Sequence, residues 1–250
     1  MQRAVDVLAQ VQPDAPRVQV LPVTQLRELS HARSAMCMPV LQVSQALSAA
    51  QLPAWGQISA VAGALAADSV VWAANAALRG EVASLVTAPL HKEALAAAGV
   101  PFPGHTEMLQ ACAALHIGVA VDDLPVRMML ANPELRTVLV SIHVSLRDAL
   151  EAITVERVLQ TLRITDASLT KILGRRPRMA VAGVNPHAGE GGLFGREEIE
   201  VLQPCLSVAK QQGLDVHGPY APDTVFMRAR KQADGRREFD VVIAMYHDQG

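Results

Sequence analysis

Three histidines, His143, His187 and His247, each follow an apolar, strand-like run of the chain and could together bind a metal ion. The runs that precede them are Val138–Ile142, Met179–Ala182 and Val241–Tyr246. In an α/β protein, residues just beyond the carboxyl ends of parallel strands converge on one crevice, where ligands bind. Three imidazoles there would make an open metal site, with further coordination positions left for water or substrate.

Each histidine also has a simpler interpretation, because a single histidine after a strand is often a structural or surface residue. The three are far apart in the sequence, so their spacing is not that of a compact zinc-binding motif. The repetition of the arrangement favours metal binding. Glycines next to His187 and His247 would also let the backbone approach a ligand closely.

Two further segments could bind an anionic group. Lys92 lies where a short strand at 83–86 is expected to lead into a helix, whose first N–H groups attract anions. An ordinary turn with an exposed lysine is the alternative. His105 and Thr106 begin another predicted helix and offer an imidazole and a hydroxyl, although a threonine with a nearby glutamate is also typical of simple N-terminal capping.

The composition argues for a globular protein and against a nucleic-acid partner. Half of the 250 residues are hydrophobic and 18% are charged, which allows a substantial core. The net charge of −2 without a basic run disfavours nucleic acid, and 3% aromatic residues leave few platforms for stacking bases. Three scattered cysteines and an N-terminus without a signal-peptide pattern predict a cytoplasmic location.

Residues 58–78 are apolar enough to resemble a membrane span. Asp68 and Asn75 interrupt the segment, and one central aspartate would cost roughly 2.5–3.5 kcal/mol on insertion. We interpret the segment as a buried, alanine-rich helix and expect no association with a membrane.

Strand-like and helix-like segments alternate along the chain, which indicates an α/β fold with a mainly parallel sheet and flanking helices. We predict strands at residues 17–21, 83–86, 126–130, 136–142, 178–182 and 239–245. We predict helices at 57–79, 90–98, 105–116, 154–173 and 196–212, with Thr154 as an N-cap, Gly80, Gly99 and Gly174 as stops, and Glu197 and Glu198 favourable to the dipole of the last helix. We divide the chain into a first α/β domain, 1–104, and a central α/β domain, 105–250, that carries the three histidines.

Five motifs in register give the chain a resemblance to a known family, from about residue 80 to its last residue. They look like those of the 4-hydroxythreonine-4-phosphate dehydrogenase family of vitamin B6 biosynthesis. The motifs are TAPLHK at Thr87–Lys92, PFPGHTE at Pro101–Glu107, HVSLRD at His143–Asp148, NPHAGEGG at Asn185–Gly192 and AMYHDQG at Ala244–Gly250.

The resemblance implies an isocitrate/isopropylmalate-dehydrogenase-like fold of two closely associated domains, in a homodimer with its active site at the interface. It implies a divalent metal held by His143, His187 and His247, one of them from the partner subunit, and substrate contacts at His105 and Thr106. It also implies NAD(P)-dependent oxidation of 4-phosphohydroxy-L-threonine and loss of carbon dioxide, giving 3-amino-2-oxopropyl phosphate. Imidazole ligands favour Zn²⁺ or Co²⁺, and substrate oxygens could admit Mg²⁺.

The chain departs from the family pattern at both ends. A glycine-containing opening segment is not found, and the family continues beyond the HDQG motif with residues that contact substrate and nucleotide. We therefore expect these 250 residues alone to bind NAD weakly and to turn over little substrate. Two alternatives stay open: a paralogue acting on another phosphorylated hydroxy acid, such as 4-phosphoerythronate, and an inactive fragment that serves as a folding or dimerisation module.

Overall fold

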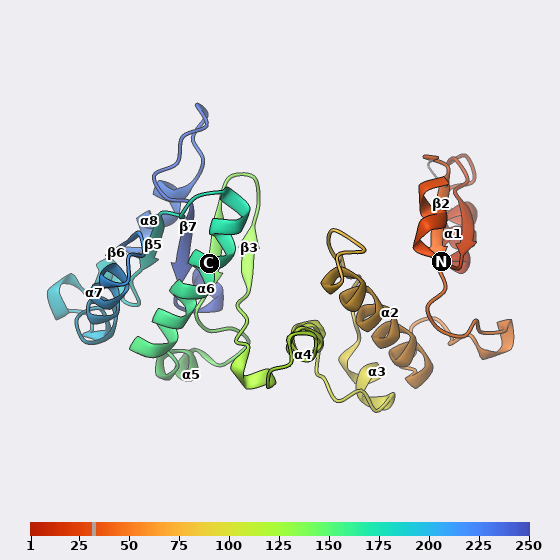
Figure 1. The fold of residues 1–250 in the computed structure, drawn as a ribbon, viewed down its shortest axis with the longest axis horizontal. Helices are drawn as coiled ribbons and strands as arrows, with labels where there is room; N and C mark the ends of the chain where they lie inside the picture. The colour runs from red at the N-terminus through yellow and green to blue at the C-terminus, as the bar shows by residue number, and fades with distance from the viewer. Residues whose placement is uncertain (32–33) are drawn as a thin grey trace. The chain divides into compact units, whose positions relative to one another are not determined.

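The computed structural model describes residues 1–31 and 34–250 and divides into two compact units (Figure 1). Unit 1 comprises Met1–Pro125 and unit 2 comprises Val126–Gly250. We expected the division just before the helix that begins at His105. In the structure this helix packs against another helix of unit 1, so the division falls after it.

Unit 1 is built around one long apolar helix. This helix, α2 (Ala60–Leu78), contacts α3 (Lys92–Ala97) and α4 (His105–Ile117). A small core lies among the three helices and consists of the buried residues Ala67, Val70, Leu95 and Met108. The other elements of unit 1 are α1 (Gln2–Val11), the parallel strands β1 (Gln19–Val23) and β2 (Cys37–Leu41), and the 3₁₀ helices η1 (Leu26–His31), η2 (Ala49–Gln51) and η3 (Val121–Asp123).

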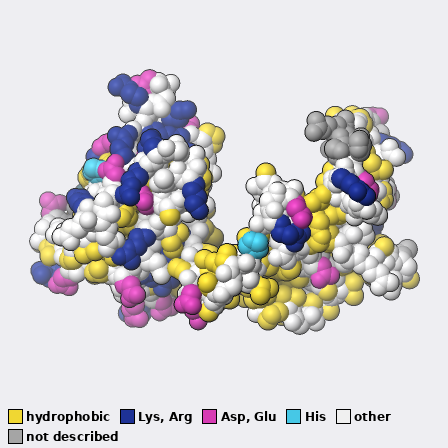
Figure 2. All heavy atoms as spheres, viewed as in Figure 1, with side chains coloured by type: hydrophobic (Ala, Val, Ile, Leu, Met, Phe, Trp, Pro, Cys, Tyr) yellow, Lys and Arg dark blue, Asp and Glu magenta, His cyan; other side chains and the backbone are white. Residues whose placement is uncertain are grey.

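Helix α2 confirms the long helix predicted at residues 57–79. The Ser59 hydroxyl caps its start by accepting a hydrogen bond from the N–H of Ala62 at 3.4 Å. Gly63 lets α3 approach closely, because a Cβ there would lie 2.0 Å from the carbonyl oxygen of Ala94. By length and composition alone α2 could cross a membrane, yet one side of it is buried against α3 and α4. Figure 2 shows hydrophobic side chains that stay exposed over α2 and α4.

The strand predicted at residues 83–86 is wrong. The segment has no regular secondary structure and pairs with no strand among the described residues, and Val86 is 91% exposed. An apolar run becomes a strand only where a neighbouring chain segment supplies partners for its backbone N–H and C=O groups. Lys92 therefore begins α3 after an irregular segment rather than after a strand.

Unit 2 contains a five-stranded sheet in the order β3-β4-β7-β5-β6. The pairs β4-β7, β7-β5 and β5-β6 are parallel, and only β3, at one edge, is antiparallel to its neighbour. This confirms the predicted α/β class with a mainly parallel sheet. The strands are β3 (Met129–Ala131), β4 (Arg136–Leu139), β5 (Met179–Ala182), β6 (Val216–Tyr220) and β7 (Val241–Ala244). The helices are α5 (Leu146–Glu151), α6 (Val155–Leu173), α7 (Gln203–Gln211) and α8 (Pro222–Ala229), with the short elements η4 (Pro186–Gly192), η5 (Glu198–Leu202, a π-helical turn) and η6 (His247–Gln249).

Helices cover both faces of this sheet. Successive strand residues point to opposite faces, so β5 and β7 contribute side chains to both cores. Val181 and Ile243 belong to the larger core, which α6 and α7 complete. Ala180 and Val242 point the other way and pack with α8. Every residue of β5 and β7 is buried, which accounts for the unbroken apolar runs of these strands.

Strand β6 was not predicted because its sequence is unusual for a strand. It contains Gly218 and Pro219, and both residue types are uncommon inside sheets except at edges and close approaches. β6 is an edge strand, and a Cβ at Gly218 would lie 2.6 Å from the carbonyl oxygen of Val181. The glycine therefore lets β6 lie against β5. Also unpredicted are α1, α5, α8 and β2.

Candidate functional site

The three histidines lie beyond the carboxyl ends of three neighbouring strands in the sheet of unit 2. Strands β4, β7 and β5 are consecutive in the sheet and parallel, so their carboxyl ends lie side by side. His143 follows β4, His247 follows β7 and His187 follows β5. Segments that are far apart in the sequence thus bring their histidines to neighbouring strand ends.

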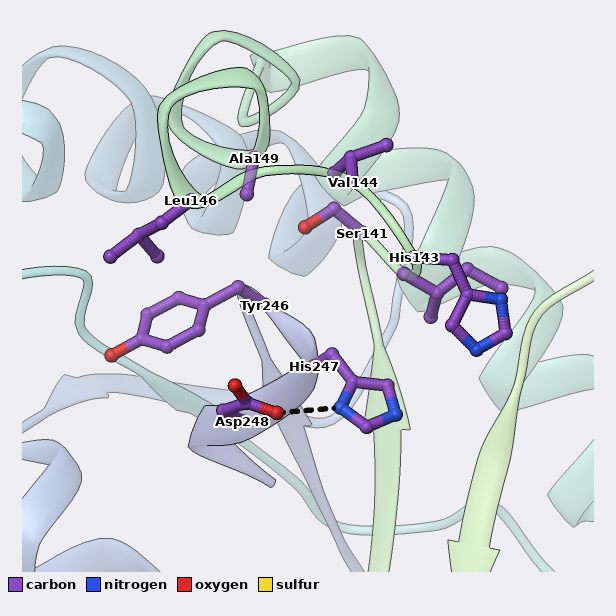
Figure 3. A pocket seen from close by; sticks show the side chains of 9 residues that line it. Ser141, His143, Val144, Leu146, Ala149, Tyr246, His247 and Asp248 are labelled. Carbon is purple, nitrogen blue, oxygen red and sulfur yellow. Dashed lines mark hydrogen bonds and ion pairs between the residues drawn. The ribbon is translucent and has the colours of Figure 1, made fainter.

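The imidazole rings of His143 and His247 lie next to each other. Their centroids are 5.7 Å apart and their planes differ by 38°, and Figure 3 shows the two rings side by side. Two imidazoles on one tetrahedral ion would have centroids roughly 5 Å apart, given metal–nitrogen bonds of about 2.0–2.1 Å. The separation of the two ring centroids is therefore close to that of two ligands of one ion.

A cavity of about 60 Å³ lies beside this pair. In Figure 3 the Tyr246 ring points away from both imidazoles, and Asp248 lies beside the His247 ring. Asp248 Oδ1 is 2.8 Å from His247 Nδ1, which leaves His247 Nε2 as the nitrogen free to bind a ligand. The cavity is lined by Ser141, Ile142, His143, Val144, Leu146, Ala149, Tyr246, His247 and Asp248.

Two of the three histidines have a backbone conformation that L-residues rarely adopt. The φ angle is +53° at both His143 and His187. Left-handed backbone costs of order 1–2 kcal/mol for a residue with a side chain, and it persists where the surrounding structure imposes it, often at ligand sites. The backbone conformation that positions these two imidazoles therefore lowers the stability of the fold.

His187 begins a run of left-handed residues. Residues 187–191 all have φ between 45° and 79°. Gly189 and Gly191 adopt this conformation readily, whereas His187, Ala188 and Glu190 do so at a cost. Such a run needs outside contacts to hold it, since left-handed residues normally occur singly.

The carboxylate of Glu198 holds the segment just before this run. Glu198 is 2% exposed, and its Oε1 accepts hydrogen bonds from the N–H groups of Val184 at 2.7 Å and Asn185 at 2.8 Å. Its Oε2 accepts a third hydrogen bond from Asn185 Nδ2 at 2.9 Å. Asn185 Nδ2 also donates to Glu197 at 2.6 Å, and this bond holds the pKa of Glu197 below its ordinary value. The sequence indicated only a helix-dipole role for both glutamates.

Gln249 links the ends of β5 and β7. Its Nε2 donates to the carbonyl oxygen of Gly183 at 2.7 Å, and its Oε1 accepts from the N–H of Met245 at 2.7 Å. One side chain therefore joins the turn that carries His187 to the turn that carries His247. This role could not be predicted from the sequence, because both contacts depend on the sheet order.

His187 does not join the His143–His247 pair in a three-ligand group. Among residues 1–31 and 34–250, no three His, Cys, Asp or Glu side chains of one chain gather as a metal-binding cluster. The His187 ring has Phe194 as an aromatic neighbour, with 6.3 Å between centroids. The shared metal site of the three histidines stays a prediction.

The candidates of unit 1 lie at helix starts. His105 is the first residue of α4, and its Nε2 is buried without a hydrogen-bond partner in the described part of the chain. The N-cap of α4 is Gly104, so the simple capping role considered for Thr106 is not observed. Lys92 is exposed at the first position of α3.

Fold and site together define an α/β protein with a histidine-bearing edge on a mainly parallel sheet. The family described as "Pyridoxal phosphate biosynthetic protein PdxA" matches residues 3–250, and the chain belongs to this family. The chain is 46% identical over 228 residues to the 4-hydroxythreonine-4-phosphate dehydrogenase of Beijerinckia indica subsp. indica, covering 90% of this chain and 64% of that protein. It is 39% identical over 233 residues to the D-threonate 4-phosphate dehydrogenase of Salmonella typhimurium, covering 92% of this chain and 67% of that protein.

A solved structure agrees with this assignment. The crystal structure of 4-hydroxythreonine-4-phosphate dehydrogenase from Klebsiella pneumoniae matches with a TM-score of 0.80 and 36% identity, over 99% of this chain and 69% of that one. The isocitrate/isopropylmalate-dehydrogenase-like fold expected from the motifs is thereby confirmed. The chain spans about two thirds of the length of these relatives.

Proposed function

We propose that this protein carries out the NAD(P)-dependent oxidation of 4-phosphohydroxy-L-threonine in pyridoxal 5'-phosphate biosynthesis, in the cytoplasm. The β-keto acid formed would lose carbon dioxide to give 3-amino-2-oxopropyl phosphate. The observation that carries the proposal is the position of His143, His187 and His247 at the ends of three neighbouring strands, in a chain of this family.

The donor chemistry of the three histidines fits a divalent metal. Neutral imidazole nitrogens suit Zn²⁺ and Co²⁺, whereas Mg²⁺ prefers oxygen ligands and would rely on those of the substrate. His143 and His247 lie close enough to provide two ligands from one chain. We propose that a second copy of the chain, in a homodimer, provides the third. When bound, the cation would lower the pKa of the substrate hydroxyl and stabilise the negative charge left by decarboxylation.

The side chains around the histidines have their own tasks. Asp248 holds His247 in the tautomer whose Nε2 carries a free lone pair. The imidazole of His105, the hydroxyl of Thr106 and the ammonium of Lys92 would bind the phosphate or carboxylate of the substrate. The unpartnered Nε2 of His105 supports this assignment, because a buried polar atom without a partner is costly unless a ligand pairs with it. The nicotinamide would accept the hydride.

D-Threonate 4-phosphate is a second candidate substrate, favoured by the 39% identity to the Salmonella typhimurium enzyme named for it. It belongs to the class of phosphorylated hydroxy acids that the sequence left open. The two substrates differ at C2, which carries an amino group in one and a hydroxyl in the other. The same metal site would serve both.

The metal site is tested by titrating the purified chain and its His143→Ala, His187→Ala and His247→Ala variants with Co²⁺, followed by absorbance. We expect each variant to lose at least tenfold in affinity, because few protein ligands are available to replace the one removed. His116→Ala removes an exposed histidine from the end of α4 and serves as the matched control, with unchanged affinity expected. Equal affinity in all four proteins would exclude the metal site.

The substrate is tested by following NADH formation with each phosphorylated acid at saturating metal. NAD is supplied in large excess, so that nucleotide binding does not limit the rate. Faster turnover of 4-phosphohydroxy-L-threonine supports the proposal, and faster turnover of D-threonate 4-phosphate replaces it with the second candidate. Metal binding without any NADH would favour the folding or dimerisation module.

A further inference from the structure

We infer that Glu198 is a positioning residue of the site: its buried carboxylate fixes the left-handed loop at 187–191 and so aims the His187 imidazole. The inference rests on the proposed metal site, to which it adds a residue outside the ligand set. It concerns how one ligand is held, and it can fail while the metal site stands.

Glu198 is buried, and its three hydrogen-bond donors all belong to the segment just before His187. They are the N–H groups of Val184 and Asn185 and the side-chain amide of Asn185, at 2.7–2.9 Å. No lysine or arginine forms an ion pair with Glu198 in the described part of the chain. A buried carboxylate without a counter-ion is costly, and it is tolerated where hydrogen bonds satisfy it fully. Its bonding capacity is thus devoted to the His187 turn.

The carboxylate also fits between the two ends of the turn. A Cβ at Gly183, before His187, would lie 3.0 Å from Glu198 Oε1. A Cβ at Gly189, after His187, would lie 2.7 Å from Glu198 Oε2. Because both positions are glycine, the carboxylate can lie close to the backbone on either side of His187.

A second contact ties this turn to the rest of the site. Gln249 accepts from the N–H of Met245 and donates to the carbonyl oxygen of Gly183, next to the N–H groups that Glu198 holds. The path from Glu198 through residues 183–185 to Gln249 therefore ties the turn that carries His187 to the turn that carries His247 in the same chain. Displacement of the carboxylate would move the His187 imidazole relative to the sheet and so relative to the ion that it would share with the partner subunit.

The test is Co²⁺ binding by Glu198→Gln, read from the affinity and from the d–d absorption bands. The substitution keeps size and one acceptor oxygen but turns an amide N–H toward Asn185 Nδ2, where two donors cannot pair. We expect a 10- to 100-fold loss of affinity, the usual effect of removing a group that orients a ligand, and altered band positions. Glu200→Gln, on the same helical segment and in an exposed pair with Arg196, is the matched control and should bind as the wild type.

A double-variant cycle separates positioning from general destabilisation. If Glu198 acts through His187, Glu198→Gln should cause no further loss in a His187→Ala background. An equal loss in both backgrounds, or wild-type affinity and spectrum in Glu198→Gln, would overturn the inference. If His187→Ala itself leaves Co²⁺ affinity unchanged, it is the metal site that fails.

Asn185→Ala covers the case in which Glu198→Gln does not fold. It removes one of the three donors to Glu198 and leaves the carboxylate in place. A smaller loss in the same direction, again absent in the His187→Ala background, is expected. Thermal melting of each metal-free variant identifies those that are folded, and unchanged affinity in folded Asn185→Ala would count against the inference.

Discussion

Asp240 lies at the opposite end of the sheet from the histidines, where it joins the starts of two neighbouring strands. It is 5% exposed, and Arg175 donates two hydrogen bonds of 2.8 Å to its carboxylate. The N–H of Arg178, just before β5, donates a third at 2.8 Å. Burial opposes ionisation, but these donors outweigh it and hold the pKa of Asp240 below its ordinary value.

A lowered pKa in the folded state makes stability depend on pH. The stabilisation from Asp240 is fully present above the unfolded pKa, about 3.9, and is lost as pH falls through the lower folded pKa. We expect Asp240→Asn to reduce the free energy of unfolding by about 1–2 kcal/mol at pH 7, a discounted value because Arg175 is half exposed. Urea unfolding from pH 7 to pH 2 should show a shallower acid decline in the variant.

Asp68→Asn is the control for this measurement, since Asp68 is exposed on α2. It should follow the wild-type pH profile. An Asp240→Asn protein with wild-type stability at pH 7 and the same acid decline would show that the Arg175–Asp240 contact contributes nothing measurable.

The residues of the site differ in how far the sequence could predict them. The three histidines were found because each follows an apolar run, and the sheet order then places those runs side by side. Glu198 could not be found this way. Its partners are Val184 and Asn185, and a glutamate in the first turn of a helix has an ordinary explanation in the helix dipole.

Among the short elements, the turn that carries His187 has the most unusual backbone conformation. The contributions of its glycines Gly189 and Gly191 to stability can be distinguished by experiment. Gly189 has φ of +79°, and a Cβ there would meet the Glu198 carboxylate at 2.7 Å. Gly191 has φ of +67° with nothing within 4 Å of an added Cβ. We expect Gly191→Ala to cost about 1 kcal/mol of unfolding free energy, from backbone conformation alone, and Gly189→Ala about 2–3 kcal/mol.

Denaturant unfolding of the two variants checks this prediction, with Gly191→Ala acting as the control for backbone strain. The difference between them measures the packing of the carboxylate against the turn. Equal costs for both substitutions would mean that Glu198 moves aside freely, which would weaken its assignment as the group that holds the loop.

The longer elements were predicted where local signals are strong. Helix α6 runs as expected from Thr154, whose hydroxyl accepts from the N–H of Arg157, to Gly174 in the left-handed conformation. Strands β5 and β7 follow from their continuous apolar runs. The failures depend on distant neighbours: residues 83–86 pair with no strand in the described part of the chain, and β6 pairs with β5 where Gly218 allows a close approach to Val181. Local sequence does not contain that information.

At the level of the molecule, the two units differ in how much core they contain. The core cluster of unit 1 has four buried members, from α2, α3 and α4. The two cores of unit 2 lie wholly within residues 126–250 and draw on both faces of its sheet. Unit 1 also keeps large apolar side chains exposed, among them Leu115 at 83%. Stability is therefore concentrated in unit 2.

We expect residues 126–250 to fold when expressed alone, because a chain of this length with a closed core can bury enough surface. Circular dichroism should show a single cooperative thermal transition for this fragment. The fragment 1–125, as the comparison, should unfold at a lower temperature or lack a cooperative transition. An unfolded 126–250 fragment alongside a folded 1–125 fragment would reverse this view of the two units.

The left-handed run at residues 187–191 has a consequence that concerns chirality rather than side-chain chemistry. An L-residue opposes this backbone, but its mirror image favours it, since a D-residue prefers positive φ. D-alanine introduced at Gly191 by chemical ligation would therefore stabilise the turn, whereas L-alanine would destabilise it. The two variants have the same atoms and differ only in the configuration of one carbon. The configuration of a single α-carbon would then control the rigidity of the loop that carries His187.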